Sequence, residues 1–410
     1  MAERMKPSGI DWIGDIPASW KRSKVKFCFS LVNGSTPESS DYDCWDGDIK
    51  WITPADMSDT GTISHGERLI TKYGYNSCGT TLLPIGSIVI SSRAPIGKIN
   101  ITTAELCTNQ GCKSLIRTGD NRYFYYLFLA GQHELSLLGR GTTFLELSTY
   151  DLNGFGLVIP AEDEQKAIAD FLYKECAQID SIAADLEKQI ALLQQYKKSL
   201  ITETVTKGLD KSVPMKDSGV EFFGKIPAHW KVSKTKYVAD ISIGLVTTMT
   251  ANYVDEDGVP LIRNSNIRTN HIDDNGMVYL SKEFAKANIG RALHKGDIVT
   301  VHTGDVGTSA IINETYHMSH GFATIISRLK TKTVNNQFLC WLYNSEIFKE
   351  MSIAYSTGDG RQNLNLYDFV DFYILIPTLK EQMEIVNWLN LKCTEIDNFI
   401  ENKQQQLLLI

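Results

Sequence analysis

The 410-residue sequence lacks the features of a membrane, secreted or zinc-binding protein. Nowhere do about 18 apolar residues follow one another, and the first residues contain no apolar run of signal-peptide length. The eight cysteines are scattered, with no Cys-x-x-Cys pair and no histidine pair at zinc spacing. We therefore expect a cytoplasmic protein with no membrane contact, no metal site, and reduced, mostly buried thiols.

Common catalytic motifs are also missing. The sequence contains neither a Gly-x-x-x-x-Gly-Lys-Ser/Thr phosphate loop nor a Gly-x-Gly-x-x-Gly turn. The Asn-Pro-Pro-aromatic motif with which amino-methyltransferases hold a flipped adenine is absent as well. The nearest histidine pair, His317 and His320, has no third metal ligand beside it. These absences predict a protein that is not an enzyme and needs no cofactor.

A basic excess, the usual mark of a nucleic-acid-binding chain, is the third absence, because the net charge is −7. Residues 1–160 carry 15 Lys and Arg against 16 Asp and Glu, and residues 207–377 carry 18 against 18. Residues 161–206 carry 5 against 9, and residues 378–410 carry 3 against 5. The acidity therefore lies in two particular segments, and the remaining two long segments are neutral.

An internal duplication is the main feature that is present. The passage "MKPSGIDWIGDIPASWKRSKVKF" from Met5 matches "MKDSGVEFFGKIPAHWKVSKTKY" from Met215 with 13 identities in 23 positions. At the same offset of 210 residues, "GSIVISSRAPIGK" from Gly86 matches "GDIVTVHTGDVGT" from Gly296. Clusters of β-branched residues between Gly, Pro, Asn and Asp predict strands and turns here. We interpret Trp20 and Trp230, which follow "IPA" in both copies, as structural anchors.

Helices are predicted at two places in each half. Residues 122–138 and 335–351 are rich in apolar residues and are expected to be buried helices. At an offset of 217 residues, "LVIPAEDEQKAIADFLYKECAQID" matches "ILIPTLKEQMEIVNWLNLKCTEID", and Thr378 with Glu381 forms a capping-box signature. The first of these passages predicts a helix from about 162 to 207, ended by Gly208.

Both long helices carry one apolar stripe at spacings of three and four residues. The stripe of the first consists of Ile168, Phe171, Leu172, Cys176, Ile179, Ile182, Leu186, Ile190 and Leu193, and that of the second of Ile385, Trp388, Leu389, Cys393, Ile396, Ile400, Leu407 and Ile410. We expect the helices to pack against each other, antiparallel because of a pseudo-two-fold duplication. The alternative is that each helix packs only on its own globular domain.

The doubled order of globular domain and long helix resembles the specificity subunit of type I restriction-modification systems over essentially the whole chain. The resemblance implies an α+β protein with two β-rich mixed target recognition domains, separated by a pair of long antiparallel, coiled-coil-like helices. The domains would span residues 1–152 and 209–369, and the helices residues 153–208 and 370–410. It further implies that each domain reads one half of a bipartite site on double-stranded DNA, and that the subunit recruits two methyltransferase and two restriction subunits.

Polar loop residues at matched positions of the two halves are the candidates for DNA contacts. Arginine suits guanine, and asparagine or glutamine suits adenine. In the first domain these are Thr53, Asp56, Ser92, Arg93, Lys98, Asn109, Gln110, Arg140, Thr142 and Thr143; in the second they are Arg263, Asn264, Asn266, Arg268, His302, Thr303, Asp305, His320, Arg361, Gln362 and Asn363. For each one, a solvated turn or a phosphate contact is the alternative. At the level of the whole chain, the alternative is a non-enzymatic scaffold that bridges two protein partners through its helices.

Overall fold

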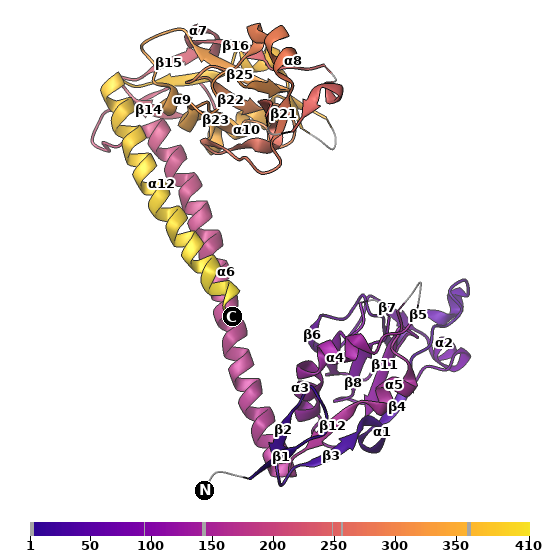
Figure 1. Ribbon diagram of the computed structural model, residues 1–410. Coiled ribbons are helices and arrows are strands. Elements are labelled where there is room, and N and C mark those ends of the chain that lie inside the picture. The colour runs from indigo at the N-terminus through magenta and orange to yellow at the C-terminus, as the bar shows by residue number, and fades with distance from the viewer. Residues whose placement is uncertain (1–3, 94, 142–144, 248, 256, 359–361) are drawn as a thin grey trace. The chain divides into compact units, whose positions relative to one another are not determined.

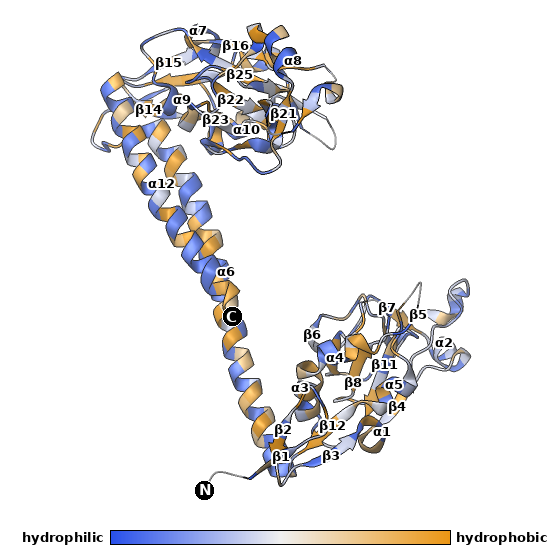
Figure 2. Cartoon of the chain, viewed as in Figure 1, coloured by the Kyte–Doolittle hydropathy of each residue, from blue (hydrophilic) through white to orange (hydrophobic). Residues whose placement is uncertain are grey.

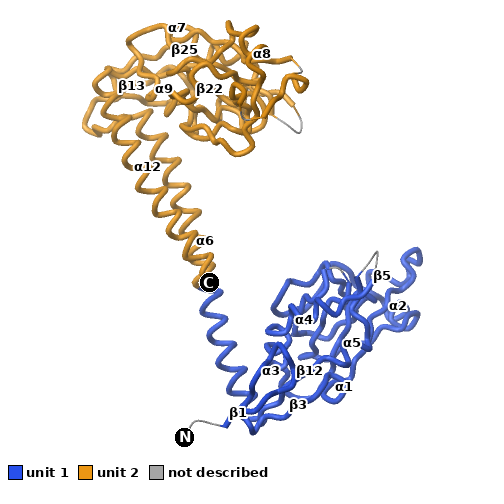
Figure 3. Tube along the Cα trace, viewed as in Figure 1, with its two compact units in different colours: residues 1–181 blue, residues 182–410 orange. Residues whose placement is uncertain are grey.

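The structure is a computed structural model that describes residues 4–93, 95–141, 145–247, 249–255, 257–358 and 362–410 (Figure 1). The chain divides into two compact units, residues 1–181 and residues 182–410 (Figure 3). Each unit contains one copy of the duplicated domain, and the boundary falls within the first long helix.

The first unit contains two main sheets. A five-stranded sheet has the order β4-β11-β8-β9-β6, and a three-stranded sheet has the order β10-β5-β7; the pairs β1-β2 and β12-β3 stand apart. The strands are β1 (Met5–Pro7), β2 (Asp15–Pro17), β3 (Lys21–Lys24), β4 (Ser30–Asn33), β5 (Trp45–Ile52), β6 (Thr60–Ile63), β7 (Arg68–Ile70), β8 (Ile88–Ser91), β9 (Ile99–Thr102), β10 (Cys107–Thr108), β11 (Cys112–Ile116) and β12 (Gly156–Ile159).

The second unit has two four-stranded sheets, of order β16-β25-β22-β23 and β17-β21-β18-β24, with the pairs β13-β14, β15-β28, β19-β20 and β26-β27. Its strands are β13 (Met215–Asp217), β14 (Lys225–Pro227), β15 (Lys231–Lys234), β16 (Ala239–Ile243), β17 (Tyr253–Val254), β18 (Val259–Arg263), β19 (Ile267–Arg268), β20 (His271–Ile272), β21 (Val278–Leu280), β22 (Ile298–Val301), β23 (Ser309–Ile311), β24 (His320–Phe322), β25 (Thr324–Leu329), β26 (Ser356–Thr357), β27 (Asn363–Leu364) and β28 (Tyr373–Ile376).

The sheets repeat between the units, which confirms the duplication. The order β4-β11-β8-β9 corresponds to β16-β25-β22-β23, and β10-β5-β7 corresponds to β24-β18-β21. The sheets that contain β5 and β18 each have one parallel pair, β5 with β10 and β18 with β24. Strands β8 and β22 are buried along their whole length, as expected for runs rich in β-branched residues that have a strand on either side.

Short helices complete each domain. They are α1 (Val25–Cys28), α2 (Lys72–Ser77), α3 (Arg122–Ala130), α4 (Gln132–Leu137) and α5 (Thr149–Gly154) in the first unit, and α7 (Thr235–Val238), α8 (Lys282–Ala287), α9 (Asn336–Tyr343), α10 (Glu346–Ala354) and α11 (Leu366–Phe369) in the second. Short 3₁₀ turns are η1 (Tyr42–Cys44), η2 (Thr250–Asn252), η3 (Asn264–Asn266) and η4 (Ile289–Arg291).

Each of the two predicted buried helices is in fact a pair of helices. Gly131 ends α3, and a Cβ atom there would lie 2.9 Å from atoms of Trp12 and Phe155, so the turn needs glycine. In the second unit, the Ser345 hydroxyl caps α10 by accepting a hydrogen bond from the Phe348 amide at 3.3 Å. Phe124, Phe128 and Leu135 in the first unit, and Phe338 and Phe348 in the second, lie in the domain cores.

The repeated tryptophans tie each domain to the first turn of its long helix. The indole of Trp20 donates to Glu164 at 3.0 Å, and that of Trp230 donates to Glu381 at 3.2 Å. Trp230 is only 1% exposed, whereas Trp20 is half-buried. The structural interpretation of both residues is therefore supported, with the hydrogen bond to the helix as an added detail.

The two long helices are α6 (Glu162–Lys207) and α12 (Leu379–Leu408). Gly208 has φ +73°, which fits its predicted role in ending α6, and the capping box of Thr378 and Glu381 is formed at the start of α12. Ahead of α6, β12 pairs with β3, so residues 156–159 belong to the sheets of the first domain.

Within the second unit, the last part of α6 and α12 form an antiparallel pair (Figure 1). Lys197 pairs with Asp397 at 2.6 Å, and Lys403 donates to Gln189 at 2.5 Å, so residue numbers rise along one helix as they fall along the other. Leu186, Ile201, Leu389 and Cys393 are buried. The pair confirms the predicted packing for this part of the chain.

The apolar stripe of α6 is only partly covered, because α6 has 46 residues and α12 has 30. Phe171 is 62% exposed, Ile179 44% and Ile182 52%, whereas Leu186 is 8% exposed. Hydrophobic residues recur along the whole of α6 (Figure 2). The helices therefore pack against each other as predicted, but this packing leaves Phe171, Ile179 and Ile182 of the predicted stripe exposed.

Candidate nucleic-acid interface

The turn that follows β5 and β18 has the same hydrogen bond in both domains. The Thr53 amide donates to Asp56 at 2.7 Å, and the Arg263 amide donates to Asn266 at 3.1 Å. Asp56 and Asn266 thus close the turns on which Thr53 and Arg263 lie. Asn266 is fully buried and also donates to the Asp273 carbonyl at 3.0 Å.

The residues just past β8 and β22 meet a later loop in each domain. Arg93 forms an isolated β-bridge with Glu146, and Thr303 forms one with Asn363 at the matching positions. The Arg93 guanidinium lies 3.4 Å from the Glu146 carboxylate, and the Thr303 hydroxyl donates to the Asn363 side chain at 3.0 Å. The residues just past the central strand and a loop distant in sequence therefore meet at one edge of each domain.

In the second domain, the edge holds a cluster of half-buried polar side chains. The Asn264 side chain accepts from the His302 amide at 3.3 Å and donates to the Thr303 carbonyl at 3.4 Å. Burial lowers the pKa of His302, so its imidazole is neutral at physiological pH. A neutral imidazole offers one donor and one acceptor, which suits hydrogen bonding to a base edge.

A surface pocket of about 340 Å³ adjoins this cluster. Asn264, Arg268, Thr303 and Asp305 all contribute to its lining. Arg268 is exposed and lies 3.2 Å from Asp273, while Arg263 donates to the Gly276 carbonyl. The structure thus brings together seven predicted residues of the second domain: Arg263, Asn264, Arg268, His302, Thr303, Asp305 and Asn363.

The remaining predicted residues lie in varied surroundings. Ser92, Asn266 and His320 are buried, out of reach of a base in this conformation. Lys98 and Asn109 are half-buried and bonded to the protein itself, Lys98 to the Met57 carbonyl at 2.7 Å and Asn109 to the Gly111 amide at 2.9 Å. The others at or near the surface are Gln110, Arg140 and Gln362; Thr142, Thr143 and Arg361 lie outside the described residues.

Glu146 was missed by sequence reasoning although it faces Arg93 and its backbone bridges Arg140. Its position corresponds to Asn363 at the offset of 217, and Asn363 was selected. Applying the offset to every selected residue would have found it. The carboxylate of Glu146 can accept a hydrogen bond from the amino group of cytosine. The residues predicted near Arg93 include no such acceptor.

Two further absences hold for the described part of the chain. Its residues contain no group of three or more His, Cys, Asp or Glu side chains arranged to hold a metal ion. No described helix is both long and apolar enough to cross a membrane.

The chain thus has two similar domains, each with the same edge of polar residues. Sequence comparison identifies the family to which this architecture belongs. Residues 17–192 and 227–408 each match the family described as type I restriction modification DNA specificity domain. The chain belongs to this family and carries two copies of its domain.

Curated relatives carry specificity-subunit names. The chain is 30% identical over 261 residues to the type I restriction enzyme MjaIX specificity subunit of Methanocaldococcus jannaschii, covering 61% of this chain and 59% of that subunit. It is 25% identical over 386 residues to the EcoBI specificity subunit of Escherichia coli, covering 92% of this chain and 80% of that subunit. The aligned region thus spans less than two thirds of the first relative and four fifths of the second.

Solved structures share the fold. A chain from a study of complex assembly and conformational transition in a type I restriction-modification system superposes with a TM-score of 0.72 at 12% identity, covering 96% of this chain and 95% of that one. The HsdS subunit from Thermoanaerobacter tengcongensis superposes with a TM-score of 0.54 at 13% identity, covering 96% and 92%. These likenesses confirm the α+β fold with long helices.

Proposed function

We propose that each domain reads one half of an asymmetric bipartite site on double-stranded DNA, through the edge where the segments after β8 and α4 meet and through its counterpart in the second domain. The observation that carries this proposal is that the two domains share one backbone arrangement at this edge but have different side chains there. Arg93 and Glu146 stand where the second domain has Thr303 and Asn363. Two recognition domains that have the same fold but different side chains at the DNA-contacting edge select different half-sites.

The chain itself would catalyse nothing in this function. We infer that it recruits two methyltransferase subunits and, for cleavage, two restriction subunits that translocate DNA, all in the cytoplasm. Residues 1–160 and 207–377 are nearly neutral, so the chain alone gains little from counterion release. The partner subunits would therefore supply much of the phosphate contact.

The long helices would set the spacing between the half-sites. One helical turn of about 5.4 Å corresponds to between one and two base pairs at about 3.4 Å each. The domain limits that we propose are residues 1–152 and 209–369, and residues 153–208 and 370–410 form segments in which one short strand precedes a long helix. The antiparallel pairing of α6 and α12 supports a rigid spacer rather than a flexible linker.

Methylation mapping of DNA modified by the reconstituted complex tests this function. Asn264→Ala should relax base preference by about 1–3 kcal/mol at one position of one half-site, because Asn264 lies at the surface pocket and offers an amide. The other half-site should keep its sequence. Asp257→Ala, a fully exposed position away from this edge, serves as the control. Unchanged preference in Asn264→Ala would exclude this residue, and a single continuous recognition sequence would exclude the bipartite reading.

A further inference from the structure

Each domain contains a surface pocket beside its opening passage, and the two pockets correspond under the duplication. The first has a volume of about 560 Å³ and the second about 410 Å³. Ile10, Trp12 and Lys24 line the first, and Val220, Phe222 and Lys234 line the second at an offset of 210. The other side consists of Tyr150, Asp151 and Phe155 in the first and Tyr367, Asp368 and Phe372 in the second, at an offset of 217.

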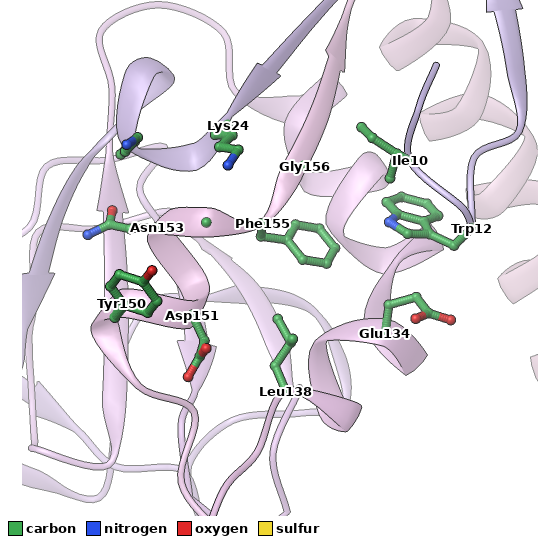
Figure 4. A pocket seen from close by; sticks show the side chains of 12 residues that line it. Ile10, Trp12, Lys24, Glu134, Leu138, Tyr150, Asp151, Asn153, Phe155 and Gly156 are labelled. Atoms are coloured by element: carbon green, nitrogen blue, oxygen red, sulfur yellow. The ribbon is translucent and has the colours of Figure 1, made fainter. Parts of the chain in front are cut away.

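The floor of the first pocket is aromatic. Trp12 and Phe155 stack with ring centroids 5.8 Å apart, and Figure 4 shows Tyr150, Asp151 and Asn153 on α5 beside them. In the second pocket, the ring centroids of Tyr355 and Phe372 lie 5.4 Å apart. Both pockets are therefore shaped to receive an apolar side chain.

Exposed aromatic side chains stand at the same positions in both halves. Tyr150 is 85% exposed and Tyr367 is 86% exposed. Phe27 and Tyr237, also a matched pair, are 73% and 65% exposed, and each lies under the ammonium group of the preceding lysine, at 4.8 Å and 5.6 Å. The fold gains nothing from such exposure, and solvent-facing aromatics in a repeated patch are typical of protein interfaces.

One difference between the two pockets is a carboxylate that pairs with the lysines. In the second, the Asp371 carboxylate lies 3.0 Å from the Lys234 ammonium and 2.6 Å from that of Lys236, and these hydrogen bonds lower the pKa of Asp371. Gly154 occupies the position of Asp371 in the first pocket. Within the described part of the chain, Lys24 and Lys26 consequently have no carboxylate in ion-pair distance.

We propose that these two pockets are docking sites for two copies of one protein chain, each copy inserting an apolar side chain next to a carboxylate, and that the first pocket binds its copy more tightly. The proposal rests on the proposed function, under which the partner present in two copies is the methyltransferase subunit. Repetition of the pocket argues for one partner bound twice. The unpaired lysines of the first pocket favour a partner carboxylate there, whereas Asp371 weakens the same attraction in the second.

DNA is the less suitable occupant of these pockets. Carboxylates line both of them, Glu134 and Asp151 in the first and Glu221, Asp368 and Asp371 in the second. Lysines line both pockets as well, so neither pocket has the basic excess that favours a phosphate backbone, and the aromatic floor offers a phosphate no partner.

Alanine variants of the exposed tyrosines test the docking sites. Native mass spectrometry of the full chain titrated with the methyltransferase subunit should show two copies bound to the wild type. Tyr150→Ala and Tyr367→Ala should each weaken the uptake of one copy about tenfold, as expected for an aromatic anchor at an interface. Tyr42→Ala is the control, because Tyr42 is 89% exposed and belongs to neither pocket.

Exchanging the charged position tests the difference in affinity. Gly154→Asp introduces a side chain into open space and should weaken the tighter copy by up to about fivefold, and Asp371→Asn should strengthen the weaker copy by a similar factor. Two copies taken up equally well by both tyrosine variants would overturn the docking sites and leave the proposed function standing. A wild-type chain that binds bipartite DNA but no methyltransferase subunit would refute both the identity of the partner and the docking sites. Loss of DNA binding alone in the tyrosine variants would make the pockets DNA contacts.

Discussion

Replacing Glu381 by glutamine should destabilise the second domain in a pH-dependent way. The carboxylate of Glu381 accepts hydrogen bonds from the Thr378 amide at 3.0 Å, the Thr378 hydroxyl at 2.7 Å and the Trp230 indole at 3.2 Å, and it lies 2.7 Å from the His229 imidazole. Burial is the largest single influence and raises the pKa, but the hydrogen bonds together outweigh it and hold the pKa at about 2.

The magnitude follows from this shift. A fall from 4.5 to about 2 is roughly 2.5 units, or about 3.4 kcal/mol at about 1.36 kcal/mol per unit. The side chain is 29% exposed, so solvent screening reduces the contribution to about 1–2 kcal/mol. Because the pKa is lower in the folded state, the contribution is fully present above about pH 4.5 and disappears as the pH falls toward 2.

Hydrogen exchange of the full chain measures the effect locally. At pH 7, amides in the first turns of α12 and in β28 should lose protection in Glu381→Gln by about 1–2 kcal/mol, and the loss should shrink near pH 3. Glu164→Gln is the matched control, because Glu164 accepts from Trp20 at 3.0 Å but Ala161 replaces the capping Thr378. Equal losses in the two variants, or an undiminished loss at pH 3, would refute this account of the site.

Two further predictions concern the recognition domains and the long helices. Exchanging residues 28–147 for the same segment of a homologue should change one half of the methylated sequence and leave the other half and the spacer intact; a change in both halves would show that the domains do not read independently. Inserting four residues after Ala184 adds about 6 Å just before the buried contacts that begin at Leu186, so methylation mapping should find a spacer longer by one or two base pairs. A two-residue insertion at the same place leaves the helix pair intact but turns the part of α6 before it by about 200°, so it should abolish methylation. An unchanged spacer in the four-residue variant would show that the helices do not set the distance between the half-sites.

The sequence predicted the elements whose signal is local and repeated. The bounds of α6, its end at Gly208 and the capping box of α12 follow from periodicity and cap residues, and the duplication follows from matched passages. Strand order was not predicted, because the parallel pairing of β5 with β10 joins residues more than 50 positions apart and depends on packing of the whole domain.

The candidate site was predicted at the level of segments rather than side chains. Matching the halves identified the loops that converge near Arg93 and Thr303. It did not identify which side chains in those loops face outward, because this depends on hydrogen bonds within each turn. Asp56 and Asn266 fold back onto their own turns, and Ser92 and His320 point into the core.

The partly uncovered stripe of α6 also has a chemical consequence. Of the eight cysteines, only Cys176 is exposed, and it lies within this stripe between Phe171 and Ile179. Burial raises the pKa of Cys107 and Cys393 to about 11 and that of Cys112 to about 12, which suppresses their reactive thiolate forms. A thiol-reactive fluorophore should therefore label the native sequence first at Cys176, which places an environment-sensitive dye beside the exposed apolar side chains of Phe171 and Ile179.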